Sequence, residues 1–135
     1  MIKRLLFTFV LASLILSACG SPANPATPSS APGGEDSAAK AVEAYLTAKV
    51  NVDQAGVRQL LCSEKEKDAD TEATTFLGVD QPKIEGMKCV SIGDNKVKCD
   101  GKITAQYGTE KNEFPLVTYR VVQEDGEWKW CGETK

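Results

Sequence analysis

The spacing of apolar residues changes at Pro82, and this change constrains the fold more than any other feature. Before it, apolar residues recur at helical spacing, at Ala38, Ala41, Val42, Tyr45, Leu46 and Val50. After it come four short β-rich segments separated by turn signals: KIEGMKCVSI, KVKCDGKITAQYG, FPLVTYRVVQ and EWKWCGE. Helices followed by strands predict an α+β domain, with N-terminal helices packed on one face of a four-stranded antiparallel sheet.

Three segments of the N-terminal half are candidates for helices. Asp36 or Ser37 can cap the first, and Asp53 can cap a second in NVDQAGVRQLLC. The acid-rich segment SEKEKDADTEATTFLG is expected to be helical in part and to end near Gly78. It lacks the Asp-x-Asp-x-Asp-Gly order of a calcium loop, so we interpret it as a solvated helix face.

Four cysteines, Cys62, Cys89, Cys99 and Cys131, lie in the β-rich domain or just before it. An even number predicts two disulfides if the chain is exported, which the N-terminal residues described next indicate, although four cysteines allow three connectivities. The chain has no histidine and no Cys-x-x-Cys pair, so we expect no metal site. A three-residue turn at residues 93–95 would place Cys89 opposite Cys99. Cys62 would then pair with Cys131 and join a helix to the last strand.

The first 18 residues have the organisation of a secretory signal: Lys3 and Arg4, then an apolar run over residues 5–16 that is short for a membrane span. LSAC, at residues 16–19, resembles the bacterial lipoprotein box, which implies a diacylglyceryl group on Cys19 and cleavage before it. An ordinary signal with an incidental cysteine and an uncleaved anchor are the alternatives. We therefore expect residues 1–18 to be a lipoprotein signal peptide and Cys19 to be a palmitate-bearing membrane anchor.

Residues 19–36 are expected to form a disordered linker between the anchor and the domain. Residues 20–34 are rich in Pro, Ser and Ala, without charge, aromatic rings or large aliphatic side chains. Such a composition buries too little apolar surface to fold, and its prolines favour an extended spacer. These features predict the extracytoplasmic face of a bacterial cell envelope. Gly20 favours the outer membrane if the cell has one.

The charge balance excludes one class of partner. The chain has 16 basic and 19 acidic residues, and loss of Lys3 and Arg4 on cleavage would leave a net charge of −5. Binding to a phosphate backbone needs clustered positive charge, which is absent from the sequence. We therefore expect no nucleic acid partner.

The helical segment AVEAYLTA and the ending EDGEWKWCGE give the chain its family resemblance. A helix of this kind, a strand hairpin and a final Gly-x-Trp-Lys strand resemble the nuclear transport factor 2-like, or cystatin-like, superfamily. Many such bacterial lipoproteins are described only as domains of unknown function. The resemblance implies a curved sheet around a long helix, often with a pocket between them and often in a dimer. It spans residues 37–133 of the domain that we place at residues 37–135.

The last two strands suggest an interaction surface. With Asp125-Gly126 as a two-residue turn, strand alternation puts Tyr119, Val121, Trp128 and Trp130 on one face and Cys131 on the other. If Cys131 faces the helices, the aromatic face points away from them and is free for a partner or a second copy. The alternative is that an irregular strand turns these rings into the core.

The sequence favours a non-catalytic domain, without cofactor, that binds a small molecule or another envelope protein. Histidine, the commonest general acid–base, is absent. The alternative is a low-turnover enzyme using a carboxylate and a tyrosine in the superfamily pocket, with Asp100 and Glu85 as the candidates. Protease inhibition, a third class, has only the fold analogy in its favour.

Overall fold

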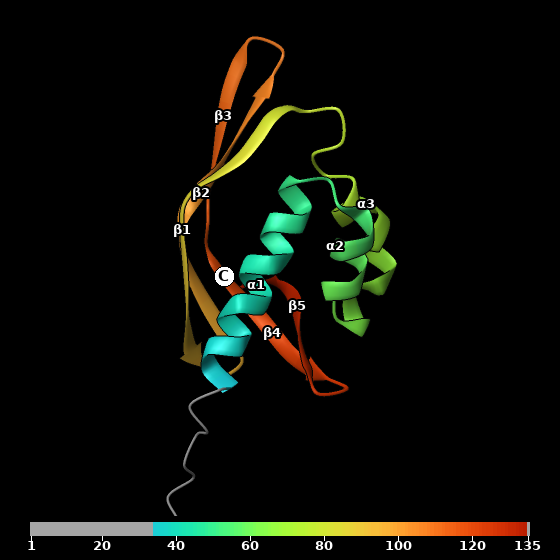
Figure 1. Cartoon of the computed structure of the whole chain (residues 1–135), viewed down its shortest axis with the longest axis vertical. Coiled ribbons are helices and arrows are strands. Elements are labelled where there is room, and N and C mark those ends of the chain that lie inside the picture. The colour runs from blue at the N-terminus through green and yellow to red at the C-terminus, as the bar shows by residue number, and fades with distance from the viewer. Residues whose placement is uncertain (1–33, 135) are drawn as a thin grey trace, which may run out of the picture.

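The computed structural model describes residues 34–134, which form four short or medium helices followed by five strands (Figure 1). The helices are α1 (Gly34–Val50), α2 (Gln54–Leu60), the 3₁₀ helix η1 (Ser63–Asp68) and α3 (Ala69–Ala73). The strands are β1 (Asp80–Gly93), β2 (Lys96–Tyr107), β3 (Glu110–Pro115), β4 (Thr118–Glu124) and β5 (Glu127–Glu133). The α+β class is confirmed. The signal peptide, Cys19 and most of the linker lie outside the described residues.

The sheet is antiparallel and open, with the order β1-β2-β4-β5 and with β3 also paired to β2. The prediction of four strands was wrong, because β3 begins at Glu110, before the predicted segment FPLVTYRVVQ, and takes only Phe114 and Pro115 from it. Pro115 has no N–H to donate, so the ladder is interrupted after it. Across the interruption, the Cys99 N–H still donates to the Val117 carbonyl and the Leu116 N–H to the Gly101 carbonyl. Both β3 and β4 therefore lie along β2.

Helix α1 packs against one face of the sheet, between β1 and β5 in Figure 1. Its residues Val42, Tyr45 and Leu46 are buried in the core. The helix begins at Gly34, so the last residues of the stretch predicted as linker are helical, and Asp36 and Ser37 lie within the first helical turn. No helix in the described part of the chain is long and apolar enough to cross a membrane.

Two tight turns set the register of the sheet. The β1–β2 turn has two residues, Asp94 and Asn95, both with positive φ (50° and 56°), where we expected three. A register shift between Ser91 and Gly93 supplies the extra residue, so Cys89 still lies opposite Cys99. The Asp125-Gly126 turn between β4 and β5 forms as predicted.

Disulfides join Cys62 to Cys131 and Cys89 to Cys99, the two pairs that the sequence favoured. The first has an unexpected setting. Cys62 follows α2 in extended conformation, and its N–H donates to the Trp130 carbonyl at 2.9 Å. A parallel bridge between Leu61 and Trp130 makes this segment a short additional edge beside β5. The disulfide therefore forms along the sheet edge.

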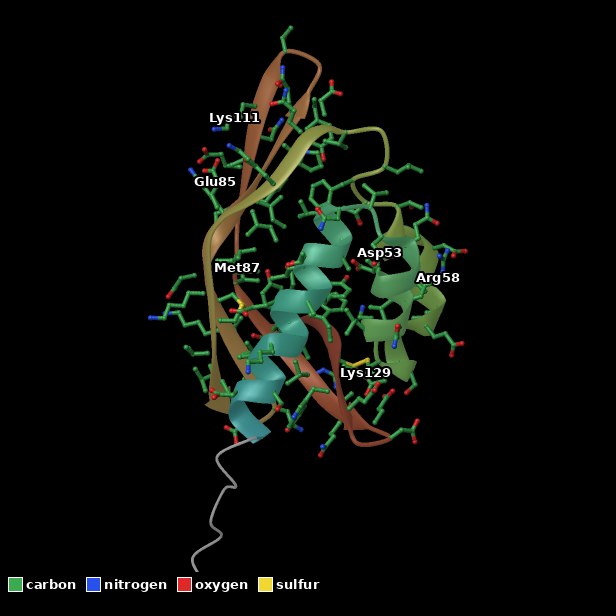
Figure 2. All side chains as sticks on the ribbon, in the orientation of Figure 1. Asp53, Arg58, Glu85, Met87, Lys111 and Lys129 are labelled. Carbon is green, nitrogen blue, oxygen red and sulfur yellow. A yellow bond between two sulfur atoms is a disulfide. The ribbon has the colours of Figure 1, made fainter. Side chains whose placement is uncertain are left out.

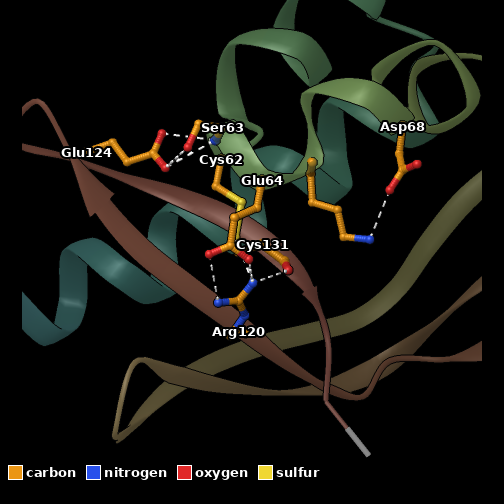
Figure 3. Close-up of a disulfide and its surroundings, with 8 residues drawn as sticks. Cys62, Ser63, Glu64, Asp68, Arg120, Glu124 and Cys131 are labelled. Carbon is orange, nitrogen blue, oxygen red and sulfur yellow. Dashed lines mark hydrogen bonds and ion pairs between the residues drawn. A yellow bond between two sulfur atoms is a disulfide. The ribbon is translucent and has the colours of Figure 1, made fainter.

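The predicted interaction surface was wrong, because three of its four side chains are core. Tyr119, Val121 and Trp130 are 3%, 1% and 4% exposed, and only Trp128 is partly exposed. The assignment of alternate faces was sound, but Cys131 does not face α1. Its sulfur lies 3.2 Å from the guanidinium of Arg120, which alternates with Tyr119 and Val121 along β4 (Figure 3). The disulfide thus holds η1 on the outer side and leaves the inner side to the aromatic rings.

Candidate ligand-binding site

A cavity of about 190 Å³ lies between α1, the segment after α3, and the sheet. Its walls are largely apolar: Leu46, Phe76, Ile103, Phe114, Pro115 and Leu116 line it. Phe76 and Phe114 meet edge-on, with ring centroids 6.4 Å apart, where the segment after α3 approaches β3. The break between β3 and β4 contributes directly to the cavity wall, because Pro115 and Leu116 lie at this break and line the cavity.

Tyr45 forms the centre of the polar wall. Its side chain is fully buried and its ring stacks on Trp130, with centroids 4.2 Å apart and planes 10° from parallel. The hydroxyl donates to a carboxylate oxygen of Glu72 at 2.7 Å. Burial and the neighbouring carboxylate raise the pKa of Tyr45 far above its usual value of about 10, so the phenol stays protonated and acts as a donor.

Lys49 lies one helical turn after Tyr45 and shares its carboxylate partner. The ammonium pairs with the same Glu72 oxygen and lies 5.8 Å from the centroid of the Tyr45 ring and 6.0 Å from that of Trp130. Only 17% of the Lys49 side chain and 20% of the Glu72 side chain are exposed. The cation therefore occupies the neighbourhood of the stacked rings and fixes Glu72 there.

Trp130 carries the clearest unmet polar group of the cavity. Its indole N–H is buried and has no hydrogen-bond partner among the described residues. A buried donor without a partner costs about 1–3 kcal/mol. Tyr119, whose ring centroid is 6.4 Å from that of Trp130, also lines the cavity. Its hydroxyl accepts a long 3.5 Å bond from the Val117 N–H, and burial raises its pKa.

The carboxylates that the sequence singled out lie elsewhere. Glu85 points to the side of the sheet opposite α1, whereas Met87 points toward the helix (Figure 2). Glu85 pairs with Lys83 at 2.7 Å, and this bond lowers the pKa of its carboxyl group. Asp100 is exposed and lies 3.9 Å from the ammonium of Lys98. Neither residue lines the cavity, and a lowered pKa is the reverse of what a general acid at neutral pH requires.

Sequence reasoning missed Lys49, which lines the cavity, and Glu72, which pairs with Lys49 and Tyr45 without lining the cavity itself. Lys49 follows Tyr45 at a spacing of four, which puts both on one face of α1 and could have drawn attention to it. Glu72 lies in the acid-rich segment, and no feature of the local sequence distinguishes it from the solvent-exposed acidic residues beside it. Tyr119 and Trp130 were singled out, but for the wrong face. Within residues 34–134 no three His, Cys, Asp or Glu side chains are grouped as they would be around a metal ion.

No known family model matches the sequence, and no curated protein is significantly similar to it. The resemblance to the nuclear transport factor 2-like superfamily therefore remains a prediction. The function has to be argued from the site itself.

Proposed function

We propose that this chain is an exported lipoprotein, anchored to the cell envelope through Cys19, whose domain binds a small molecule in the cavity between α1 and the sheet. The signal-like residues 1–18, the LSAC box and the proline-rich residues that follow support the anchor. A helix packed on an open antiparallel sheet, with a cavity between them, supports placing the domain in the nuclear transport factor 2-like, or cystatin-like, superfamily.

The observation that carries the binding proposal is an apolar cavity lined by Trp130, whose buried indole N–H has no hydrogen-bond partner among the described residues. Ligand sites are typically apolar hollows with a few convergent polar groups that orient the ligand. The volume of about 190 Å³ exceeds the ~150 Å³ of an engineered apolar cavity that holds benzene. The dimensions therefore suit a molecule about the size of a substituted aromatic ring.

Native mass spectrometry of the full chain, extracted with mild detergent from membranes of a bacterial host, tests this proposal. We expect a mass that includes an acylated Cys19, two disulfides and a retained small molecule. The variant Leu116→Phe, which adds volume at the cavity wall, should lose the small molecule. Val117→Phe is the matched control, because Val117 is 36% exposed and does not line the cavity. Equal retention in both variants would contradict binding at this cavity.

The same spectrum tests association with a partner. A homodimer or a complex with another envelope protein stays a prediction, and the buried aromatic rings no longer provide its surface. A dimer without any retained small molecule, in wild type and in Val117→Phe alike, would shift the assignment from ligand binding to a protein-interaction role.

A low-turnover enzyme is the second candidate, and the Tyr45–Glu72 hydrogen bond favours it. A carboxylate and a protonated phenol side by side can transfer a proton and stabilise a developing oxyanion. Incubating the protein with any compound released from it distinguishes the two roles. Turnover that Glu72→Gln abolishes, with binding retained, would establish an enzyme, whereas unchanged compound supports a binding protein.

A further inference from the structure

The polar groups around the cavity are unevenly divided between donors and acceptors. The Trp130 indole N–H has no acceptor among the described residues. The Tyr119 hydroxyl receives a bond from Val117, and no acceptor for its own proton is found in the described part of the chain. The two acidic groups nearby differ: Glu72 already accepts from Tyr45 and Lys49, and Glu133 is exposed at the margin. Two residues that line the cavity, Trp130 and Tyr119, therefore have hydrogen-bond donors without an acceptor among the described residues.

A cationic ligand fits this wall poorly. The faces of aromatic rings attract cations, but the ammonium of Lys49 already lies 5.8 Å from the ring centroid of Tyr45 and 6.0 Å from that of Trp130. A second cation in the same cavity would be repelled by the first. It would also leave the indole N–H without an acceptor.

An anionic ligand fits no better. The one ammonium that lines the cavity is paired with Glu72, and Glu133 adds a second negative charge at the margin. An anion entering the cavity would lose its hydration and meet no unpaired cation among the lining residues. An uncharged oxygen acceptor avoids both costs and still satisfies the donors.

From this arrangement we infer that the ligand is a small uncharged molecule with an apolar body and one hydrogen-bond-accepting oxygen, as in a ketone, ester or amide. The oxygen is bound by the indole N–H of Trp130 and the hydroxyl of Tyr119. The body packs against Phe76, Ile103 and Phe114. This inference rests on the proposed binding function and specifies its ligand class.

Four probes of similar size and different charge test the inference: acetophenone, ethylbenzene, benzoate and benzylamine. Each is titrated into the ¹⁵N-labelled full chain, extracted from membranes in the same mild detergent. The chain has two tryptophans, and the indole resonance that Trp130→Phe removes is that of Trp130. We expect acetophenone to shift this resonance and to bind at least tenfold more tightly than each of the other three.

Two variants each remove one donor and leave an aromatic ring at the position, and only Trp130→Phe also makes that ring smaller. Trp130→Phe and Tyr119→Phe should each weaken acetophenone binding about tenfold and leave ethylbenzene binding unchanged. Trp128→Phe is the matched control, because Trp128 does not line the cavity and should change neither affinity. If Trp130→Phe does not fold, Tyr119→Phe, which loses only one oxygen, still decides the question.

The outcomes separate the two proposals. Tighter binding of benzoate or benzylamine overturns the ligand class while the cavity remains a binding site. Equal affinity for acetophenone and ethylbenzene overturns the role of the donors. Failure of all four probes to bind overturns the ligand class, and the retained mass in the extracted protein then decides on the binding function separately.

Discussion

At the scale of single residues, Tyr45 connects the fold to the site. Its ring stacks on Trp130 in the core, and its hydroxyl holds Glu72 of α3 against α1. A phenol that donates to a carboxylate in a buried setting makes a stronger hydrogen bond than two neutral groups do. The same side chain therefore stabilises the packing of α3 and shapes the polar wall of the cavity.

Tyr45→Phe should lower the free energy of unfolding by about 1–2 kcal/mol, because the ring stack survives while Glu72 loses a donor. Urea denaturation followed by tryptophan fluorescence measures this change. Tyr107→Phe serves as the control and should change stability very little, since Tyr107 is 44% exposed. Equal effects of the two substitutions would show that the Tyr45 hydroxyl contributes nothing to stability.

The raised pKa values of Tyr45 and Tyr119 predict an alkaline limit to stability. Both phenols keep their protons in the folded state above pH 10, whereas the unfolded chain releases them near pH 10. The stabilising contribution is therefore complete below pH 10. It falls above that value, by about 1.4 kcal/mol per pH unit for each retained proton. Urea midpoints from pH 8 to 11.5 measure the fall, and Tyr45→Phe should make it shallower. An equally steep fall in that variant would assign the retained protons to other groups.

The residue scale is also where the sequence was least informative about the site. The 3.6-residue spacing on α1 identified Tyr45 as inward-facing, and strand alternation placed Tyr119 and Trp130 on one face. Which face meets the helices depended on Cys62, whose extended backbone runs along the edge of β5. A segment that pairs with the edge of a distant strand gives no local sequence signal. The rings of Tyr119 and Trp130 were therefore assigned to the surface, although they form part of the core.

At the scale of elements, turn chemistry made the hairpins predictable. Asp-Asn and Asp-Gly provide the two residues of positive φ that tight hairpins need. The Asp125-Gly126 turn forms as expected, and the first turn lies within residues 93–95 but has two residues instead of three. The division of the third β segment into β3 and β4 was not foreseen. Its cause is a proline that ends a strand while the chain stays bonded to β2, and FPLVTYRVVQ has the same apolar content either way.

The two disulfides should contribute unequally to stability. Cys62 and Cys131 are separated by 69 residues and Cys89 and Cys99 by 10, so the first bond restricts the unfolded chain more. Chain-entropy arguments give about 4 kcal/mol for the long loop and about 3 kcal/mol for the short one. Replacing each pair by alanines and comparing free energies of unfolding in guanidinium measures the difference.

The surroundings of the two disulfides also favour a larger effect from the Cys62–Cys131 bond. Loss of the Cys62–Cys131 bond also removes the covalent link between the start of η1 and β5, beside the Arg120–Cys131 contact, whereas the Cys89–Cys99 pair is already held by the β1–β2 ladder (Figure 3). Removing Cys62–Cys131 is therefore expected to cost more stability than removing Cys89–Cys99, whether loop length or local contacts contribute more. A larger loss from the Cys89/Cys99 replacement would contradict both the loop-length argument and the role of the edge.

At the scale of the whole molecule, the change of periodicity at Pro82 was enough to predict an α+β architecture, because layers follow from which segments are helices and which are strands. The cavity could not be predicted in the same way. It depends on how the segment after α3 meets β3, and on a strand break that brings Pro115 and Leu116 to the wall. These are relations between segments far apart in sequence.

The organisation of the full chain predicts that lipid attachment and domain stability are independent. Cys19→Ser removes the thiol that accepts the diacylglyceryl group, and two acyl chains hold a protein on a membrane far more firmly than one. We expect the wild-type chain to float with membranes in a density gradient and to incorporate labelled palmitate, and the variant to do neither. Ser21→Ala, two residues away, is the matched control and should behave like wild type.

The fold should not change with the anchor, because the residues between Cys19 and α1 are polar or small and provide no apolar surface for the core. Cys19→Ser should therefore unfold at the same temperature as wild type and keep the same acetophenone affinity. If the variant still floats with membranes but lacks label, the apolar residues 5–16 are an uncleaved anchor, and the mass of the N-terminal peptide will show it. If instead the variant loses stability, the linker contacts the domain, and the tether interpretation is wrong.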